Sequence, residues 1–220
     1  MRRTSHLALD RRRTSVVSVA VSIALAVVLV PGPGDRAGAA VPDDLVFPQD
    51  PEVTTFSNSW GASRSGGRRH RGTDLLAPKL SPVFAVADGV VSRLDWSRLG
   101  GFGLWIDHGE FVSVYLHLNN DTPGTDDGKG HPAWTYAPGI AEGVRVSAGQ
   151  FVAFVGDSGN AERTTPHTHF ELHVGNGKVN PYPHLAAAWA RATRNGAAVF
   201  AYGEPLDEQP IPAAIGMFAD

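Results

Sequence analysis

The segment from Val83 to Leu94 reads VFAVADGVVSRL and contains the pattern on which the fold prediction rests. A short apolar run leads to Asp88-Gly89, a dipeptide typical of tight turns, and a second run rich in valine follows. Such runs are typical of β-strands, because branched and aromatic side chains fit the pleated surface of a sheet. The segment therefore predicts two strands joined as a hairpin.

The central part of the chain repeats this pattern. We expect further strands at 102–107, 111–118, 144–146, 150–155 and 169–174, with Gly, Pro, Asp and Asn between them. Short strands at regular spacing predict a mostly-β protein, built as a single compact antiparallel β domain. Apolar and small residues at helical spacing from Leu185 to Thr193 predict a short C-terminal helix.

Residues 119–143 interrupt the strand pattern. This stretch contains three prolines and five glycines. A loop of this length inside a compact domain is usually either functional or an insertion. We expect an insertion, and three roles stay open for it: narrowing a groove, conferring specificity or decorating the surface.

Residues 1–40 have the three parts of a secretory signal peptide. Arginines at 2, 3 and 11–13 precede the uncharged, mostly apolar run 16–30, and the small residues 37–40 offer a cleavage site. The run is short for a membrane span, so we expect a secreted or cell-wall-associated protein without a stable span after cleavage. An uncleaved membrane anchor is the less favoured alternative. Residues 41–57, with prolines at 42, 48 and 51, predict an extended lead-in.

Charge and composition exclude several classes of function. Beyond residue 40 the chain has 13 Lys and Arg against 20 Asp and Glu, a net charge of −7, which argues against nucleic acid as a partner. Cysteine is absent, so neither disulfides nor thiolate metal ligands are possible. The length suits one domain with its own core, and we expect a monomer. One basic patch (Arg64, Arg68, Arg69 and Arg71) lies beside His70 and is either an anion-binding surface or a solvated loop.

The strand around residues 167–173 reads HTHFELH. Side chains alternate across a sheet, so His167, His169 and Glu171 share one face, and Phe170 and Leu172 share the apolar, core-packing face. Titratable groups on a strand whose other side is buried predict the wall of a site. Exposed strand faces are polar in any case, so the short H-x-H match is weak when taken alone.

Two other segments add candidate ligands. His70 and Asp74 lie four residues apart, but Gly72 argues against a helix, so a loop or strand bend would have to bring them onto one ion. Alternation places Tyr115 and His117 on one strand face, over a cleft. Three nitrogen or oxygen ligands with an open fourth position are typical of a catalytic zinc site. The competing interpretation of each residue is a solvated surface side chain.

A serine nucleophile is a competing possibility. Residues 156–159 read GDSG, as around the nucleophile of serine proteases, and His70, Asp107 and Ser158 follow in the order His, Asp, Ser. The same residues are also good turn formers after an apolar run. A serine hydrolase using Ser158 is therefore a distant third hypothesis. His108, at a glycine-containing turn, is expected to be a structural, hydrogen-bonded histidine.

Taken together, the motifs resemble the lysostaphin/LytM-type zinc metallopeptidases. The matching motifs are, in order, His70-Arg-Gly-Thr-Asp74, Pro82 to Val91, Gly101-Phe-Gly103, Ile106 to Gly109, Tyr115-Leu-His-Leu118, Gly149-Gln150, Gly156 to Gly159, His167-Thr-His-Phe-Glu171 and Val179-Asn-Pro181. They cover residues 58–185, which we expect to form the LytM-like domain, followed by a C-terminal helix and tail at 186–220. The resemblance implies a grooved antiparallel β domain, one Zn²⁺ per chain and a peptidoglycan peptide as substrate.

The resemblance also assigns roles to residues. It implies His70, Asp74 and His169 as metal ligands, and His117 and His167 as catalytic histidines. Strand geometry alone leaves open which histidine of the H-x-H pair ligates the metal.

The remaining candidates are weaker. Tyr115 and Glu171 are expected to bind substrate or to support the metal ligands, and Thr168 departs from the apolar residue usual in the family. The implied function is an exported zinc metalloendopeptidase that hydrolyses peptide bonds in peptidoglycan cross-links or stem peptides. The alternative is a non-catalytic LytM-like module that binds wall peptide or regulates an amidase. Such members typically lack ligands, whereas here all five positions are filled.

Overall fold

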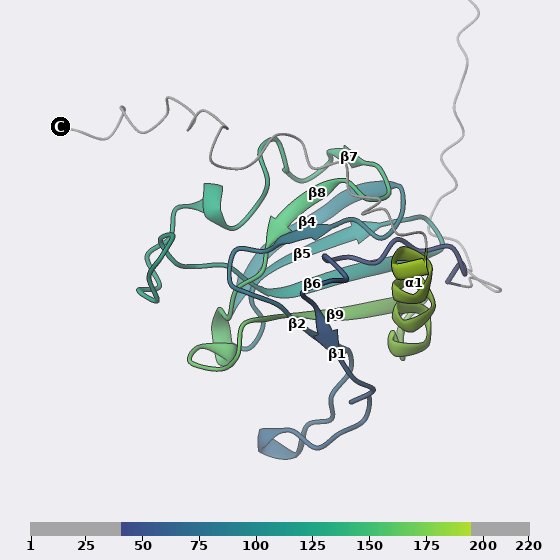
Figure 1. The fold of residues 1–220 in the computed structure, drawn as a ribbon, viewed down its shortest axis with the longest axis horizontal. Helices are drawn as coiled ribbons and strands as arrows, with labels where there is room; N and C mark the ends of the chain where they lie inside the picture. The colour runs from purple at the N-terminus through teal and green to yellow at the C-terminus, as the bar shows by residue number, and fades with distance from the viewer. Residues whose placement is uncertain (1–40, 195–220) are drawn as a thin grey trace, which may run out of the picture. The chain divides into compact units, whose positions relative to one another are not determined.

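The structure, a computed structural model, describes residues 41–194. Its main element is an eight-stranded antiparallel sheet (Figure 1). Across the sheet the strands are β1 (Thr55–Phe56), β2 (Thr73–Leu76), β9 (His167–Val174), β6 (Phe111–Leu118), β5 (Gly101–Asp107), β4 (Gly89–Ser97) and β7 (Arg145–Val146), and β10 (Gly177–Val179) also pairs with β9. The predicted mostly-β, antiparallel fold is confirmed.

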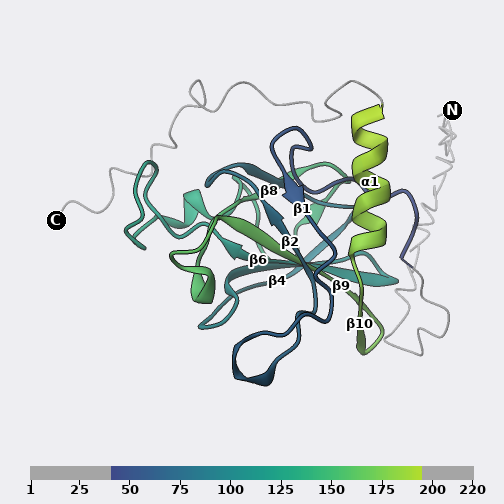
Figure 2. The ribbon, with the colours of Figure 1, turned by 60° about the horizontal axis from the view of Figure 1, so that its bottom comes forward.

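A second sheet has two strands, β3 (Pro82–Phe84) and β8 (Phe151–Phe154). Buried side chains of both sheets join one apolar cluster, which includes Val83 and Val152 from the small sheet and Leu104 and Phe170 from the large one. The helix α1 (Tyr182–Arg194) lies beside β9 in both ribbon views and adds Leu185 and Ala188 to this cluster (Figures 1 and 2). Three short 3₁₀ helices, η1 (Ser65–Gly67), η2 (Pro132–Trp134) and η3 (Gly159–Ala161), lie in loops.

The predicted hairpin at Asp88-Gly89 is wrong. The strand β3 pairs with β8, whereas β4 pairs with β5 and β7, so the turn carries the chain from one sheet to the other. The physical reason is burial, because Val83, Phe84, Ala85 and Val86 are all buried. A run that is apolar on both sides belongs between two layers, not in a hairpin with one exposed face.

The lead-in segment 41–57 packs into the domain. Leu45 and Phe47 are buried in the apolar cluster, and β1 adds an edge strand to the large sheet. The buried amide of Gln49 donates to Thr168 Oγ1 at 2.9 Å. This bond satisfies the hydroxyl that stands where an apolar residue was expected, since a buried polar group costs stability unless it is paired.

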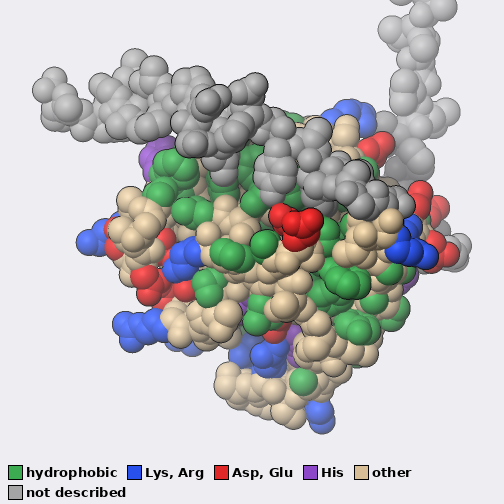
Figure 3. All heavy atoms as spheres, in the orientation of Figure 1, with side chains coloured by type: hydrophobic (Ala, Val, Ile, Leu, Met, Phe, Trp, Pro, Cys, Tyr) green, Lys and Arg blue, Asp and Glu red, His purple; other side chains and the backbone are tan. Residues whose placement is uncertain are grey.

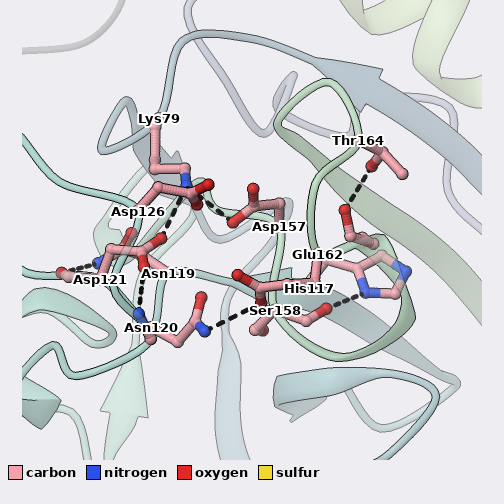
Figure 4. A network of polar contacts seen from close by, with 12 residues as sticks. Lys79, His117, Asn119, Asn120, Asp121, Asp126, Asp157, Ser158, Glu162 and Thr164 are labelled. Atoms are coloured by element: carbon pink, nitrogen blue, oxygen red, sulfur yellow. Dashed lines mark hydrogen bonds and ion pairs between the residues drawn. The ribbon is translucent and has the colours of Figure 1, made fainter.

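The segment 119–143 connects β6 to β7 and is fastened at its base. Lys79 Nζ lies 2.7 Å from Asp121 Oδ2, 2.7 Å from Asp126 Oδ1 and 3.0 Å from Asp157 Oδ1 (Figure 4). The carboxylates of Asp121 and Asp157 are almost completely buried, so the ammonium compensates charges that water cannot reach. The start of the insertion is therefore ion-paired to the loops around it.

Residues 1–40 and 195–220 lie outside the described residues, and with them the expected signal peptide and most of the expected C-terminal tail. Within 41–194, no helix is long and apolar enough to span a membrane.

Candidate metal centre

Three predicted ligands converge at the junction of β2 and β9. Asp74 and His169 are directly opposed in the antiparallel register of these strands, and His70 lies just before β2. His70 Nε2 is 3.0 Å from Asp74 Oδ1 and 2.9 Å from His169 Nδ1. Asp74 Oδ1 and His169 Nδ1 are 2.8 Å apart. Three ligand atoms this close can share one ion at the usual zinc–nitrogen and zinc–oxygen distance of about 2.0–2.2 Å.

The outer nitrogens of the two imidazoles fix which nitrogen faces inward. His70 Nδ1 lies 3.1 Å from the carbonyl oxygen of Ser59, and His169 Nε2 lies 3.1 Å from Glu171 Oε1. His70 Nδ1 also lies 2.9 Å from Ser59 Oγ, which can accept as well as donate. When each outer nitrogen donates to its oxygen, a neutral ring presents a lone pair at its inner nitrogen. Two lone pairs and a carboxylate oxygen pointing at one another form a set of acceptors that suits a divalent cation.

The surroundings of Asp74 keep its carboxylate charged. Burial raises the pKa of Asp74, but the rings of His169 and His70, when protonated at their inner nitrogens, donate hydrogen bonds that outweigh burial, so its pKa lies well below the usual range. Gly72 leaves the space that the His169 ring needs, since a Cβ there would lie 2.6 Å from His169 Nε2. The glycine between His70 and Asp74 thus has a steric role in the site.

His117 and His167 stand beside these ligands. Their ring centroids are 5.0 Å apart, and His167 Nε2 is 4.0 Å from Asp74 Oδ1. His117 Nδ1 donates to the Ser158 carbonyl at 2.8 Å (Figure 4), and His167 Nδ1 donates to the Thr165 carbonyl at 2.7 Å. In both rings Nε2 is therefore the free, basic nitrogen. Burial, followed by the nearby His167, lowers the pKa of His117 to about 4, so His117 is neutral at pH 7.

The face predicted for Tyr115 is wrong. Its side chain is fully buried in the apolar cluster, where its hydroxyl accepts a hydrogen bond from Val86 N at 3.1 Å. Strict alternation fails at the end of β6, because His117 has a φ of 61°, a left-handed conformation that side chains other than glycine rarely adopt. This turn of the backbone brings both Leu116 and His117 to the groove side.

Glu171 lies on β9 behind the ring of His169. Its carboxylate accepts from His169 Nε2 at 3.1 Å, from His173 Nε2 at 2.6 Å and from Lys178 Nζ at 2.7 Å. Burial raises the pKa of Glu171, but these three partners outweigh burial and hold its pKa well below the usual value. The alternation predicted for this strand is confirmed, since Phe170 and Leu172 pack in the core.

The five histidine and aspartate side chains lie in a groove of about 810 Å³. One part of its lining is the loop with Arg64, Arg68, Arg69 and Arg71, and other parts come from β4, β5 and the residues 160–165. In Figure 3, basic and histidine side chains meet in the hollow above the lowest loop of the view. No residue of the insertion 119–143 lines this groove.

Ser158 lies in a structural position. Its Oγ accepts from Phe102 N at 3.0 Å and donates to the Leu118 carbonyl at 2.6 Å, and the residue is fully buried. Both capacities of the hydroxyl are therefore used by the backbone. The sequence did not indicate the carbonyl groups that orient His70, His117 and His167, because every residue type carries a carbonyl.

Several known proteins have sequences similar to this chain. The sequence profile of peptidase family M23 matches residues 68–128. The chain is 34% identical over 149 residues to the L-Ala–D-Glu endopeptidase of Bacillus subtilis. The aligned region covers 62% of this chain and 41% of that relative. The chain is 31% identical over 115 residues to the peptidoglycan DD-endopeptidase ShyC of Vibrio cholerae, covering 52% and 22%.

A solved structure adds to this comparison. A candidate glycyl-glycine endopeptidase LytM from Ruminococcus gnavus is 27% identical, with a TM-score of 0.52 over 66% of this chain and 61% of that one. The fold and sequence together define a LytM-type domain. The match at residues 68–128 and these similarities show a peptidase M23 domain that is homologous to the L-Ala–D-Glu endopeptidase and to LytM structures. The chain spans less than half the length of the two curated relatives above.

Proposed function

We propose that this protein is an exported zinc metalloendopeptidase that hydrolyses peptide bonds in peptidoglycan cross-links or stem peptides. One observation carries the proposal: two imidazole nitrogens and a carboxylate oxygen converge within 3.0 Å, next to two further histidines with free Nε2 atoms. His70, Asp74 and His169 would hold one Zn²⁺. The protein would act as a monomer, with residues 1–40 as its signal peptide and 58–185 as its catalytic domain.

The bound zinc ion would supply a Lewis acid that polarises the scissile carbonyl and makes water acidic near neutral pH. His117, neutral because of its lowered pKa, accepts a proton from the attacking water at Nε2. His167 Nε2, 4.0 Å from Asp74 Oδ1, accepts a hydrogen bond that orients the water or, once protonated, donates to the developing oxyanion. The Nε2–H formed on a histidine then donates its proton to the leaving amine.

Backbone carbonyls hold these histidines for proton transfer. A ring fixed through Nδ1–H cannot rotate its basic nitrogen away from the groove without losing a hydrogen bond of 2.7 or 2.8 Å. Such positioning is a main source of catalytic power in general acid–base chemistry.

Metal analysis combined with wall digestion tests the proposal. The purified protein should contain about one zinc per chain and release peptide fragments from purified cell walls, and a chelator should stop the release. Stoichiometric zinc without any fragments would favour the non-catalytic wall-binding module. Digestion that survives complete zinc removal would sink the metallopeptidase. Mass analysis of the fragments identifies the bond cut, and N-terminal sequencing of exported protein tests cleavage near Ala40.

A further inference from the structure

The groove has one wall with an unbalanced positive charge. The loop from Gly61 to Arg71 folds back on itself, with hydrogen bonds from Arg64 N to the Arg68 carbonyl at 2.9 Å and from His70 N to the Ala62 carbonyl at 2.8 Å. Its four arginines are exposed and line the groove that contains the candidate metal centre. The loop is thus an ordered support for several guanidinium groups.

Three of these guanidinium groups are held by neutral partners. Arg68 donates to the Ser65 carbonyl at 3.1 Å, Arg69 donates to the Gly61 carbonyl at 3.1 Å, and Arg71 lies 5.7 Å from the centre of the Trp60 ring. Within residues 41–194 none of the three forms an ion pair, so their charges are uncompensated. A guanidinium has five N–H donors, so each retains donors for a ligand.

The other cations of the groove differ in this respect. Arg64 pairs with Asp74 at 2.5 Å, Arg93 pairs with Asp95, and Lys178 pairs with Glu171 at 2.7 Å. The excess charge is therefore concentrated on the loop wall. The chain beyond residue 40 carries a net charge of −7, so the charge of this loop wall is opposite in sign to the net charge of that part of the chain.

We propose that Arg68, Arg69 and Arg71 form an anion-binding wall that recognises a carboxylate of the peptide substrate near the scissile bond. This inference rests on the proposed function and deepens it, because it selects acidic peptides over neutral ones such as glycine bridges. A peptide lying along the groove between this wall and the catalytic histidines would place an acidic residue opposite the three guanidinium groups. Arginine pairs well with carboxylates because its planar donors match their two oxygens.

Two peptides that differ in one group provide the test: a wall-derived peptide containing Glu and the same peptide with Gln in its place. Binding to the zinc-loaded protein is measured by calorimetry, and hydrolysis is measured as kcat/KM. We expect the Glu peptide to be preferred roughly tenfold in both, and the preference to shrink with added salt. The combined variant Arg68→Gln/Arg69→Gln/Arg71→Gln should bring the ratio close to one.

A matched control removes the same charge elsewhere. The variant Lys129→Gln/Arg145→Gln/Arg194→Gln alters three exposed cations that do not line the groove, and it should keep the preference. Equal loss of preference in both triple variants would overturn the proposal in favour of bulk charge. An unchanged preference for the Glu peptide in the Arg68→Gln/Arg69→Gln/Arg71→Gln variant would also overturn the proposal. The same holds if this variant binds anionic wall polymer more weakly but binds and cuts both peptides as before.

The two levels of proposal can fail separately. If neither peptide is cut but calorimetry still shows a carboxylate preference that depends on the three arginines, the anion-binding wall stands and the endopeptidase proposal fails. If both peptides are cut equally well and bound equally well by the unaltered protein, the endopeptidase stands and the wall is refuted.

Discussion

The Nε2 atom of His169 donates a hydrogen bond of 3.1 Å to Oε1 of Glu171, two residues further along the same strand. This bond leaves Nδ1 of His169 facing Asp74 and His70. A carboxylate behind a ligating imidazole fixes the ring and increases its basicity.

Replacing Glu171 should therefore weaken metal binding without removing a ligand. Glu171→Ala is expected to lower zinc affinity by about 10- to 100-fold, measured by competition with a chromophoric chelator. The exposed Glu110→Ala on the turn between β5 and β6 is the control and should leave the affinity unchanged. Equal affinity in both variants would show that Glu171 does not support the ligand.

The two histidines of the H-x-H pair should differ in their effects. His169→Ala is expected to abolish stoichiometric zinc binding, because its Nδ1 lies within 2.9 Å of both other ligand atoms. His167→Ala should retain zinc and lose activity by at least about 100-fold, the usual contribution of a general acid or base. Metal content and kcat/KM are measured for both variants. The opposite pattern would reverse the roles proposed for the pair.

Ser158→Ala should reduce stability and leave the chemistry in place. The hydroxyl is buried and bonded to Phe102 N and the Leu118 carbonyl, so its loss should cost about 1–3 kcal/mol in the free energy of unfolding. The bond from His117 is made to the backbone carbonyl of Ser158 and persists in the variant. Thermal unfolding and wall digestion well below the Tm are the measurements. Labelling of Ser158 by a serine-reactive probe, with complete loss of digestion in the variant, would revive the serine hydrolase.

Lys79→Met should destabilise the base of the insertion. Its removal leaves the buried carboxylates of Asp121 and Asp157 without their cation, and breaking a buried pair on one side typically costs about 3–5 kcal/mol. Urea unfolding measures the change in stability. The exposed Lys129→Met in the same loop should be within about 0.5 kcal/mol of the unaltered protein. A similar small effect of both variants would mean that the buried network contributes little.

Stability should fall as the pH drops below 6.5, partly through His108. This side chain hydrogen-bonds the Asp88 carbonyl at 2.8 Å and Ser113 Oγ at 2.7 Å, and burial lowers its pKa despite the nearby Asp88 and Asp107. On acidification the unfolded chain therefore binds a proton at this histidine at a higher pH than the folded chain does. The stability that neutral His108 contributes is complete above pH 6.5 and is lost as the pH falls from 6.5 through its folded-state pKa.

The variant His108→Gln isolates this contribution. Urea unfolding between pH 7.5 and 5.5 should show a smaller loss of stability on acidification than in the unaltered protein, since one titrating group is gone. The exposed His131→Gln serves as the control and should retain the full slope. If His108→Gln keeps that slope as well, His108 does not titrate differently in the folded state.

The strands and the polar face of β9 were predictable from sequence. Both depend on the two-residue period of a strand, which is a local property of the backbone. The hairpin at Asp88-Gly89 and the placement of Tyr115 were predicted incorrectly. The hairpin is wrong because β8, the partner strand of β3, lies more than 60 residues further along the chain. The placement of Tyr115 is wrong because a positive φ at His117 interrupts the alternation.

The residue types of the site, the strand periodicity and the family resemblance follow from short sequence motifs. The pairing of Asp74 with His169, 95 residues apart and facing each other across β2 and β9, follows from the folded structure alone. The folded structure also shows which ring nitrogens point inward, and that three arginines beside the groove have no acidic partner within residues 41–194. These properties depend on strand register, backbone carbonyls and long-range contacts, which form only when distant segments pack together.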